Sequence, residues 1–166
     1  MSERNKVAII MGSDSDFSTV KPGIELLKSF GVHVDVKILS AHRTPDHVAE
    51  YARTAQQRGI GVIIGAAGKA AHLPGIIAAY TTLPVIGLPI KSSTLDGLDS
   101  LLSIVQMPKG IPVATVAING SENAALLAAQ ILALGDEKLS ETLKQYRISM
   151  EEQVLAKNEQ VQKELG

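Results

Sequence analysis

Cysteine and tryptophan are absent from the chain, and aromatic residues of any kind make up only 3% of it. Without cysteine the protein has no disulfide, no thiolate nucleophile and no cysteine-based metal site. With so few aromatic rings it lacks the platforms on which single-stranded nucleic acids stack their bases. The formal net charge of −1 supplies no basic field either. We therefore expect no nucleic-acid partner.

The sequence also lacks an apolar run long enough to cross a membrane. The polar residues 1–6 lead into only five apolar residues, and the apolar stretch near residues 124–134 is interrupted by Gln130. A chain of 166 residues that is 45% apolar and 20% charged has the composition of one globular domain. We expect a cytoplasmic protein with a single domain, residues 1–166, and no membrane partner.

What the sequence does contain is a repeated alternation of short apolar runs, turns rich in glycine, serine and aspartate, and segments of helical periodicity. Strands are expected at residues 6–11, 32–38, 61–66, 85–88 and 113–118, and helices at residues 17–30, 46–58, 76–80, 97–105 and 123–134. This order predicts an α/β protein, a flavodoxin-like three-layer αβα sandwich with a parallel, doubly wound sheet. Ligands of such sheets bind at the carboxyl ends of the strands, so the site is expected in the turns after the first three strands.

Residues 137–166 differ from the rest of the chain and are expected to form a charged helical tail. Apolar residues recur along it at helical steps: Leu139, Leu143, Tyr146, Met150, Val154 and Val161. This thin stripe could pack on its own domain or on a neighbouring subunit, and we favour the neighbouring subunit.

The first turn, residues 12–16, reads Gly-Ser-Asp-Ser-Asp between a strand and a helix. Exposed amide groups and the helix dipole make such a junction a natural phosphate cradle. Alternatively, Ser15 or Asp16 serves only as a helix cap, which the turn taken alone slightly favours. The turn has neither the lysine of a P-loop nor the spacing of a dinucleotide fingerprint. A phospho-acceptor pair of Asp14 and Asp16 is disfavoured because intervening residues separate both from the strand end.

The second turn, residues 40–45, reads Ser-Ala-His-Arg-Thr-Pro and places an imidazole beside a guanidinium. His42 belongs to the residue type that titrates near neutrality and is suited to give or take a proton. Arg43 offers a two-pronged donor for phosphate. Taken alone, however, a His-Arg pair is more often structural, with the histidine packed and the arginine solvated.

The third turn, residues 67–75, is made largely of small residues that let the backbone approach a ligand closely, and it carries Lys69 and His72. Taken singly, His72 would most often be structural and Lys69 a surface charge. Because His42 and His72 fall in separate turns without a short metal-ligand spacing, we expect no metal site. A serine hydrolase is also disfavoured, because no Gly-x-Ser-x-Gly pattern occurs.

Together the three turns resemble the signature loops of the class I 5-(carboxyamino)imidazole ribonucleotide mutases, the family of the phosphoribosylaminoimidazole carboxylase catalytic subunit. The similar segments are Met-Gly-Ser-Asp-Ser-Asp at residues 11–16, Ser-Ala-His-Arg-Thr-Pro at residues 40–45 and Ala-Ala-His-Leu-Pro-Gly at residues 70–75. Residues 103–113 and 123–133 resemble two further family segments, so the likeness runs in order from about residue 7 to residue 134.

The resemblance implies an isomerase of purine (IMP) biosynthesis that converts 5-(carboxyamino)imidazole ribonucleotide to 4-carboxy-5-aminoimidazole ribonucleotide without a metal or an organic cofactor. It implies that His42 is the catalytic acid and base and that Ser13, Asp16 and Arg43 hold the ribose phosphate. It implies a wider set of substrate-binding residues: Ser13, Ser15, Asp16, Ser40, Arg43, Gly68, Ala70, His72 and Leu73. It also implies a homo-octamer with sites at subunit interfaces.

Such a reaction suits a single imidazole. A His42 cation would protonate the carbamate nitrogen as carbon dioxide leaves, and the neutral imidazole would then remove the proton from the ring carbon after carbon dioxide adds there. Recapture of carbon dioxide needs a closed pocket, which a site between subunits would supply.

Two alternatives remain: a carboxylase that uses free carbon dioxide, and a non-catalytic nucleotide-binding module. The carboxylase class resembles Ser-Ala-His-Lys in the second turn and lacks His-Leu-Pro in the third. Arg43 and the sequence His72-Leu73-Pro74 therefore favour the mutase.

The third turn departs from the family pattern, which is richer in glycine. Ala66 and Lys69 stand where glycine is expected. A positive φ at Lys69 would strain the backbone. Otherwise the loop tolerates the lysine, with its side chain facing outward or towards the carboxylate.

Overall fold

The computed structural model describes residues 5–166 and contains one five-stranded parallel sheet. Its strands are β1 (Lys6–Met11), β2 (His33–Ile38), β3 (Ile60–Gly68), β4 (Val85–Ile90) and β5 (Ala114–Thr115). Their order in the sheet is β2-β1-β3-β4-β5. The chain moves from β1 to one side and then returns to the other, which confirms the predicted doubly wound, flavodoxin-like α/β fold.

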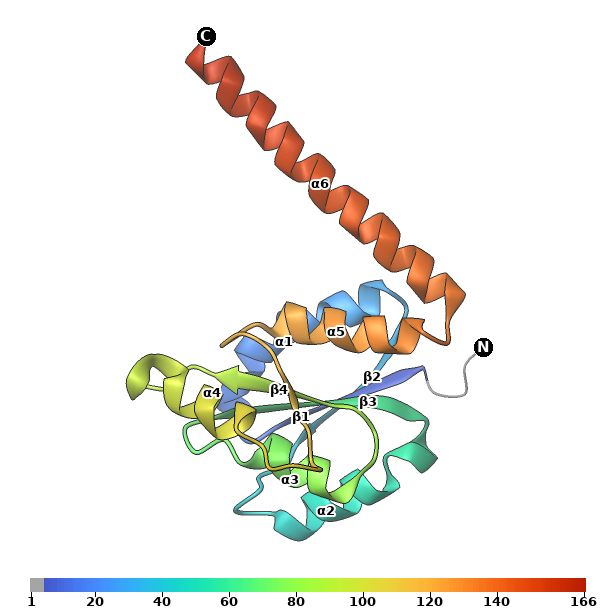
Figure 1. Cartoon of the computed structure of the whole chain (residues 1–166), viewed down its shortest axis with the longest axis vertical. Helices are drawn as coiled ribbons and strands as arrows, with labels where there is room; N and C mark the ends of the chain where they lie inside the picture. The colour runs from blue at the N-terminus through green and yellow to red at the C-terminus, as the bar shows by residue number, and fades with distance from the viewer. Residues whose placement is uncertain (1–4) are drawn as a thin grey trace.

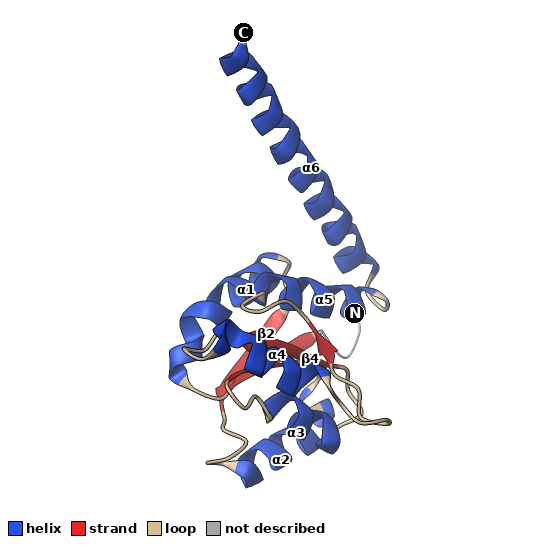
Figure 2. Ribbon diagram, turned by 60° about the vertical axis from the view of Figure 1, so that its left-hand side comes forward, coloured by secondary structure: helices blue, strands red, loops and turns tan. Residues whose placement is uncertain are grey.

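Helices cover both faces of the sheet (Figures 1 and 2). One face carries α1 (Phe17–Ser29) and α5 (Ser121–Ala133). The other carries α2 (Pro45–Thr54), α3 (Leu73–Tyr80) and α4 (Leu98–Val105). Three short 3-10 turns complete these layers: η1 (Asp14–Asp16), η2 (Gln56–Arg58) and η3 (Leu95–Gly97).

Strand β1 is apolar and buried from Val7 to Met11 because both of its faces are covered. Alternate side chains enter opposite cores: Ile9 packs in the cluster beneath α1 and α5, and Ile10 in the cluster above α2 and α3. Side chains of a strand alternate between faces, so a continuous apolar run is what a doubly covered strand requires. The turn after β1 is thereby fixed at the carboxyl edge of the sheet.

Four strands, β2 to β5, differ in length from their predicted ranges, and β3 and β5 differ most. β3 continues through Gly68, which pairs with Ile90 of β4, so the third turn begins later than predicted. The predicted strand 113–118 is too long, because β5 covers only Ala114–Thr115. Pro112 precedes this edge strand and has no N–H to donate. Beyond β5 two backbone bonds still reach β4: the N–H of Val116 donates to the carbonyl of Gly87 at 3.1 Å, and that of Asn119 to the carbonyl of Pro89 at 2.8 Å.

The last helix, α6 (Glu137–Leu165), begins at an Asp136 cap whose side chain accepts the N–H of Leu139 at 3.0 Å. Its first turns pack on the domain: Leu139 is buried, and the Tyr146 ring meets Phe30 edge-on with centroids 5.3 Å apart. The rest projects away from the sheet (Figure 1). Among residues 5–166, no helix combines the length and the apolarity that a bilayer crossing requires.

Candidate active site

A cavity of about 560 Å³ opens at the carboxyl edge of the sheet. It is formed by the turns after β1, β2 and β3 together with the end of β4. The structure brings all ten predicted site residues to its wall: Ser13, Ser15, Asp16, Ser40, His42, Arg43, Gly68, Ala70, His72 and Leu73. Chain reversal between β1 and β3 leaves a crevice at this edge, which is where open α/β sheets bind ligands.

The first turn gathers hydroxyl groups at the start of α1. Ser13 caps η1, the short turn that leads into α1, because its Oγ accepts the N–H of Ser15 at 3.3 Å, and neither Ser15 nor Asp16 caps α1 through its side chain. The Ser15 hydroxyl in turn lies 3.0 Å from Ser13 Oγ and 3.3 Å from Asp16 Oδ1. Burial raises the pKa of the Asp16 carboxyl above its ordinary value, and hydrogen bonds from Ser15 and Ser13 partly oppose this. The turn therefore presents hydroxyls and a carboxyl of perturbed acidity beside a helix start.

The second turn is held in shape by two hydroxyls. Thr44 Oγ1 accepts the N–H of Ser40 at 2.9 Å, and Ser40 Oγ accepts the N–H of Arg43 at 3.2 Å and that of His42 at 3.4 Å. Such local side-chain to backbone bonds fix a turn that has no strand partner. Arg43 Nη2 then reaches the first turn and donates to the carbonyl of Gly12 at 3.3 Å. The two turns are thus tied together on the cavity wall.

The imidazoles of the second and third turns meet directly. Nε2 of His42 lies 2.8 Å from Nδ1 of His72, and the rings are edge-on with centroids 5.0 Å apart. One nitrogen donates and the other accepts, so the contact holds a proton between them. This contact joins the second turn to the third on the cavity wall.

The third turn contains a backbone position that favours glycine. Lys69 has φ +56°, in the left-handed region, so the strained arrangement considered from the sequence is the one observed. Gly68 beside it packs tightly, because a Cβ there would lie 3.3 Å from the carbonyl oxygen of Ile90. The turn after β3 is therefore pressed against the end of β4.

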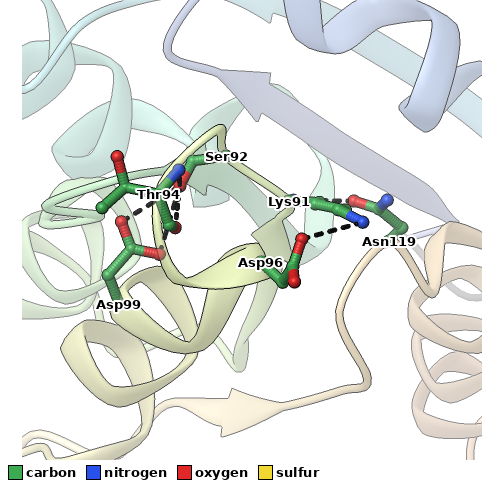
Figure 3. A network of polar contacts seen from close by, with 6 residues as sticks. All are labelled: Lys91, Ser92, Thr94, Asp96, Asp99 and Asn119. Carbon is green, nitrogen blue, oxygen red and sulfur yellow. Dashed lines mark hydrogen bonds and ion pairs between the residues drawn. The ribbon is translucent and has the colours of Figure 1, made fainter.

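The end of β4 supplies a fourth wall that the sequence analysis did not identify: Ile90, Lys91 and Ser92. Figure 3 shows the polar network behind it. Lys91 Nζ pairs with Asp96 Oδ1 at 3.1 Å, and its N–H donates to Asn119 Oδ1 at 2.8 Å. These residues carry no recognisable motif. Only the adjacency of β4 to β3 brings them to the same edge.

Two other observations bear on where chemistry takes place. A larger cavity, about 840 Å³, lies at the amino end of β4, but among residues 5–166 Arg53 is the one charged residue that lines it. Within residues 5–166 no group of three or more histidine, aspartate or glutamate side chains is arranged to hold a metal ion. The smaller cavity, by contrast, is lined by side chains of both charges, among them Asp16, Arg43 and Lys69.

Several known proteins resemble this chain in sequence. Residues 6–153 match the model of the family described as AIR carboxylase. The N5-carboxyaminoimidazole ribonucleotide mutase of Pyrococcus abyssi is 61% identical over 145 residues, which cover 87% of this chain and 83% of the relative. The phosphoribosylaminoimidazole carboxylase of Candida albicans is 58% identical over 160 residues, 96% of this chain but only 28% of that longer protein.

A solved structure agrees with these sequence relatives. PurE from Treponema denticola superposes with a TM-score of 0.83 at 30% identity, and the match covers 93% of this chain and 97% of that one. The resemblance extends over the whole sheet and therefore over the edge on which the cavity lies.

Proposed function

Because the chain belongs to the AIR carboxylase family, we propose that its cavity converts a carbamate into a ring carboxylate with His42 as the one acid and base. The activity is that of an N5-carboxyaminoimidazole ribonucleotide mutase, an isomerase of purine biosynthesis. The observation that carries the assignment of His42 is its 2.8 Å contact with His72 inside the cavity.

The reaction proceeds in two steps that exchange one proton. In the first, protonated His42 gives its proton to the carbamate nitrogen as the N–C bond breaks and carbon dioxide leaves. In the second, the ring carbon attacks carbon dioxide, a C–C bond forms, and neutral His42 removes the proton from that carbon. Atoms and charge balance without an oxidant or a reductant, so we propose that no metal or organic cofactor takes part.

The substrate phosphate is assigned to the side of the cavity formed by β1 and β2. Ser13 and Ser15 offer hydroxyls at a helix start, and Arg43 offers a guanidinium beside them. Helix starts and arginine are the groups that bind phosphate most readily in proteins. Asp16 would then accept a ribose hydroxyl. Ser40 holds the second turn, while Gly68, Ala70, His72 and Leu73 would line the base and the carboxylate.

We also propose that the protein is a cytoplasmic homo-oligomer, an octamer by its resemblance to the family, in which α6 packs on a neighbouring subunit. The support is the apolar stripe of α6, which begins on the protein's own core with Leu139 and continues beyond it. Met150 is 48% exposed, Val154 65% and Val161 52%. A neighbour that covers this stripe would also help to exclude water from the site.

The test is to give the purified protein the carbamate ribonucleotide, labelled in its carboxyl carbon, without ATP or added metal. We expect the carboxylated product to form with the label retained and without dependence on bicarbonate. Product that forms only when bicarbonate is added, with the carbamate inert, would instead identify a carboxylase. Tight binding without any product would identify a non-catalytic nucleotide-binding module.

A further inference from the structure

Lys69 occupies a backbone position that disfavours it. Its φ of +56° lies in the left-handed region, where a Cβ crowds the backbone and glycine fits without penalty. Strained positions of this kind persist where the surrounding structure enforces them, and they concentrate at functional sites. The backbone of the turn therefore gives no reason for a lysine at this position.

Lys69 is also a cavity lysine whose ammonium group has no ion-pair partner among residues 5–166. Two lysines line the cavity, Lys69 and Lys91. Lys91 is held by Asp96 at 3.1 Å (Figure 3). Lys69 forms no ion pair with any of residues 5–166. An ammonium group left without a partner on the wall of a cavity is available to an anionic group of a ligand.

The strand order decides which anionic group Lys69 meets. Arg43 and the hydroxyls of the first turn belong to β2 and β1, whereas Lys69 follows β3, on the other side of β1. Lys69 lies three residues before His72, whose ring contacts His42. Any carboxylate that His42 helps to move must lie beside this imidazole pair. The carboxylate would therefore lie within reach of a lysine side chain on the turn that carries His72. The phosphate would lie instead beside the turns after β1 and β2.

We propose that Lys69 binds the migrating carboxylate, so that the cavity distinguishes carboxylated ribonucleotides from the uncarboxylated aminoimidazole ribonucleotide. The inference rests on the proposed function, because it takes the substrate and the role of His42 from it. The Lys69 ammonium would donate to the carboxylate both while it is attached to nitrogen and while it is attached to carbon. An interaction made equally with substrate and product strengthens binding of both and acts mainly on KM.

Three variants separate charge from backbone strain. Lys69→Gly removes the charge and relaxes the left-handed position, Lys69→Gln removes the charge and keeps a side chain there, and Lys69→Arg keeps the charge. Lys21→Gln is the matched control, because Lys21 is exposed on α1, is paired with Glu25 at 3.6 Å and does not line the cavity. Binding of the carboxylated product and of the uncarboxylated ribonucleotide is measured by calorimetry for each protein.

Lys69→Gly and Lys69→Gln should each weaken binding of the carboxylated product about tenfold, the size expected for a lost charge-assisted hydrogen bond. Binding of the uncarboxylated ribonucleotide should change less than about twofold. Lys69→Arg and Lys21→Gln should leave both affinities close to those of the parent. Lys69→Gly should in addition melt at a higher temperature than Lys69→Gln, because it relieves the positive φ.

Equal weakening of both ligands, or no weakening of either, would overturn the role of Lys69. This outcome is distinct from failure of the proposed function. If the parent protein bound neither ribonucleotide and did not convert the carbamate, the function would fail whatever the variants did. If the parent protein turned over normally and the variants bound the product as tightly as the parent, the function would stand and only the role of Lys69 would fall.

Discussion

Asp16 is the residue of the cavity wall whose pKa the fold shifts. Its carboxyl sits half-buried on the cavity wall, and burial raises its pKa from an ordinary value near 3.8. A carboxyl whose pKa is higher in the folded than in the unfolded chain makes the folded state less stable once it is ionised. The cost is present at neutral pH and disappears as the pH falls below the ordinary value.

Replacement of Asp16 by asparagine should therefore stabilise the protein at pH 7 while weakening substrate binding. We expect a rise of about 1–3 °C in the midpoint of thermal unfolding. The difference from the parent should shrink as the pH is lowered towards 3.8. Asp14→Asn, in the same turn but outside the cavity wall, is the control and should give a smaller difference. A variant less stable than the parent at pH 7 would contradict the sign of the effect.

At this scale, most of the residues that line the cavity could be predicted from the sequence, but not all of them. His42, Arg43 and His72 could be predicted because each lies in a turn of distinctive composition after an apolar strand. The cap at Ser13 could not be predicted, because three neighbouring side chains are all competent to form it. Lys91 and Ser92 could not be predicted either, since they look like an ordinary polar linker until β4 is placed beside β3.

At the scale of elements, α1 and α5 pack closely where Gly23 of α1 faces the start of α5. A Cβ at Gly23 would lie 2.5 Å from the carbonyl oxygen of Ser121, the first residue of α5. The carbonyl of Ser121 is part of the backbone and cannot turn aside as the end of a flexible side chain can. The two helices would therefore have to separate. This contact supports the face of the sheet behind the first turn.

Gly23→Ala should therefore destabilise the protein by about 1–3 kcal/mol, the usual size of an overpacking effect in a close-packed core. The measurement is the midpoint of urea denaturation. Gly135→Ala is the matched control, because a Cβ there would come no closer than 4.0 Å to Leu132 O; its effect should stay within about 0.5 kcal/mol. Equal stability of the two variants would show that α1 and α5 can move apart freely.

The elements themselves were predicted well where periodicity was strong and poorly where pairing decided their length. β1 has its predicted bounds because six consecutive residues, KVAIIM, lie in a strand covered on both faces. The fifth strand was overestimated, because its apolar residues do not reveal that it lies at an edge with pairing to β4 alone. Helix α2 ends at Thr54, earlier than predicted, and the next turn is 3-10 up to Gly59 at φ +77°.

At the scale of the whole molecule, α6 carries an apolar stripe that its own domain covers only in part. The helix has 29 residues, so it is about 43 Å long, and only its first turns pack on the domain. A long helix with a polar majority and an uncovered apolar stripe gains little stability by itself. We therefore propose that the stripe contacts a second copy of the chain.

Removal of residues 148–166 should reduce the mass of the assembly measured by light scattering and lower turnover at least tenfold, because the sites lose closure. The circular dichroism spectrum of the remaining domain should keep its α/β character, since Leu139 and Tyr146 stay in place. Val154→Glu should reproduce the loss of mass, whereas Glu152→Gln, on the opposite side of α6, should not. An unchanged mass in the truncated protein would remove α6 from the interface.

The account as a whole depends on His42 as the group that carries the proton. The most direct measurement is turnover of the carbamate by His42→Asn, compared with binding of the carboxylated product by the same protein. We predict a loss of turnover of at least about a hundredfold, the usual range for removal of an acid–base group, with the product affinity within about threefold of the parent. His47→Asn, an exposed histidine of α2, should behave as the parent does. Turnover by His42→Asn at close to the parent's rate would contradict the assignment.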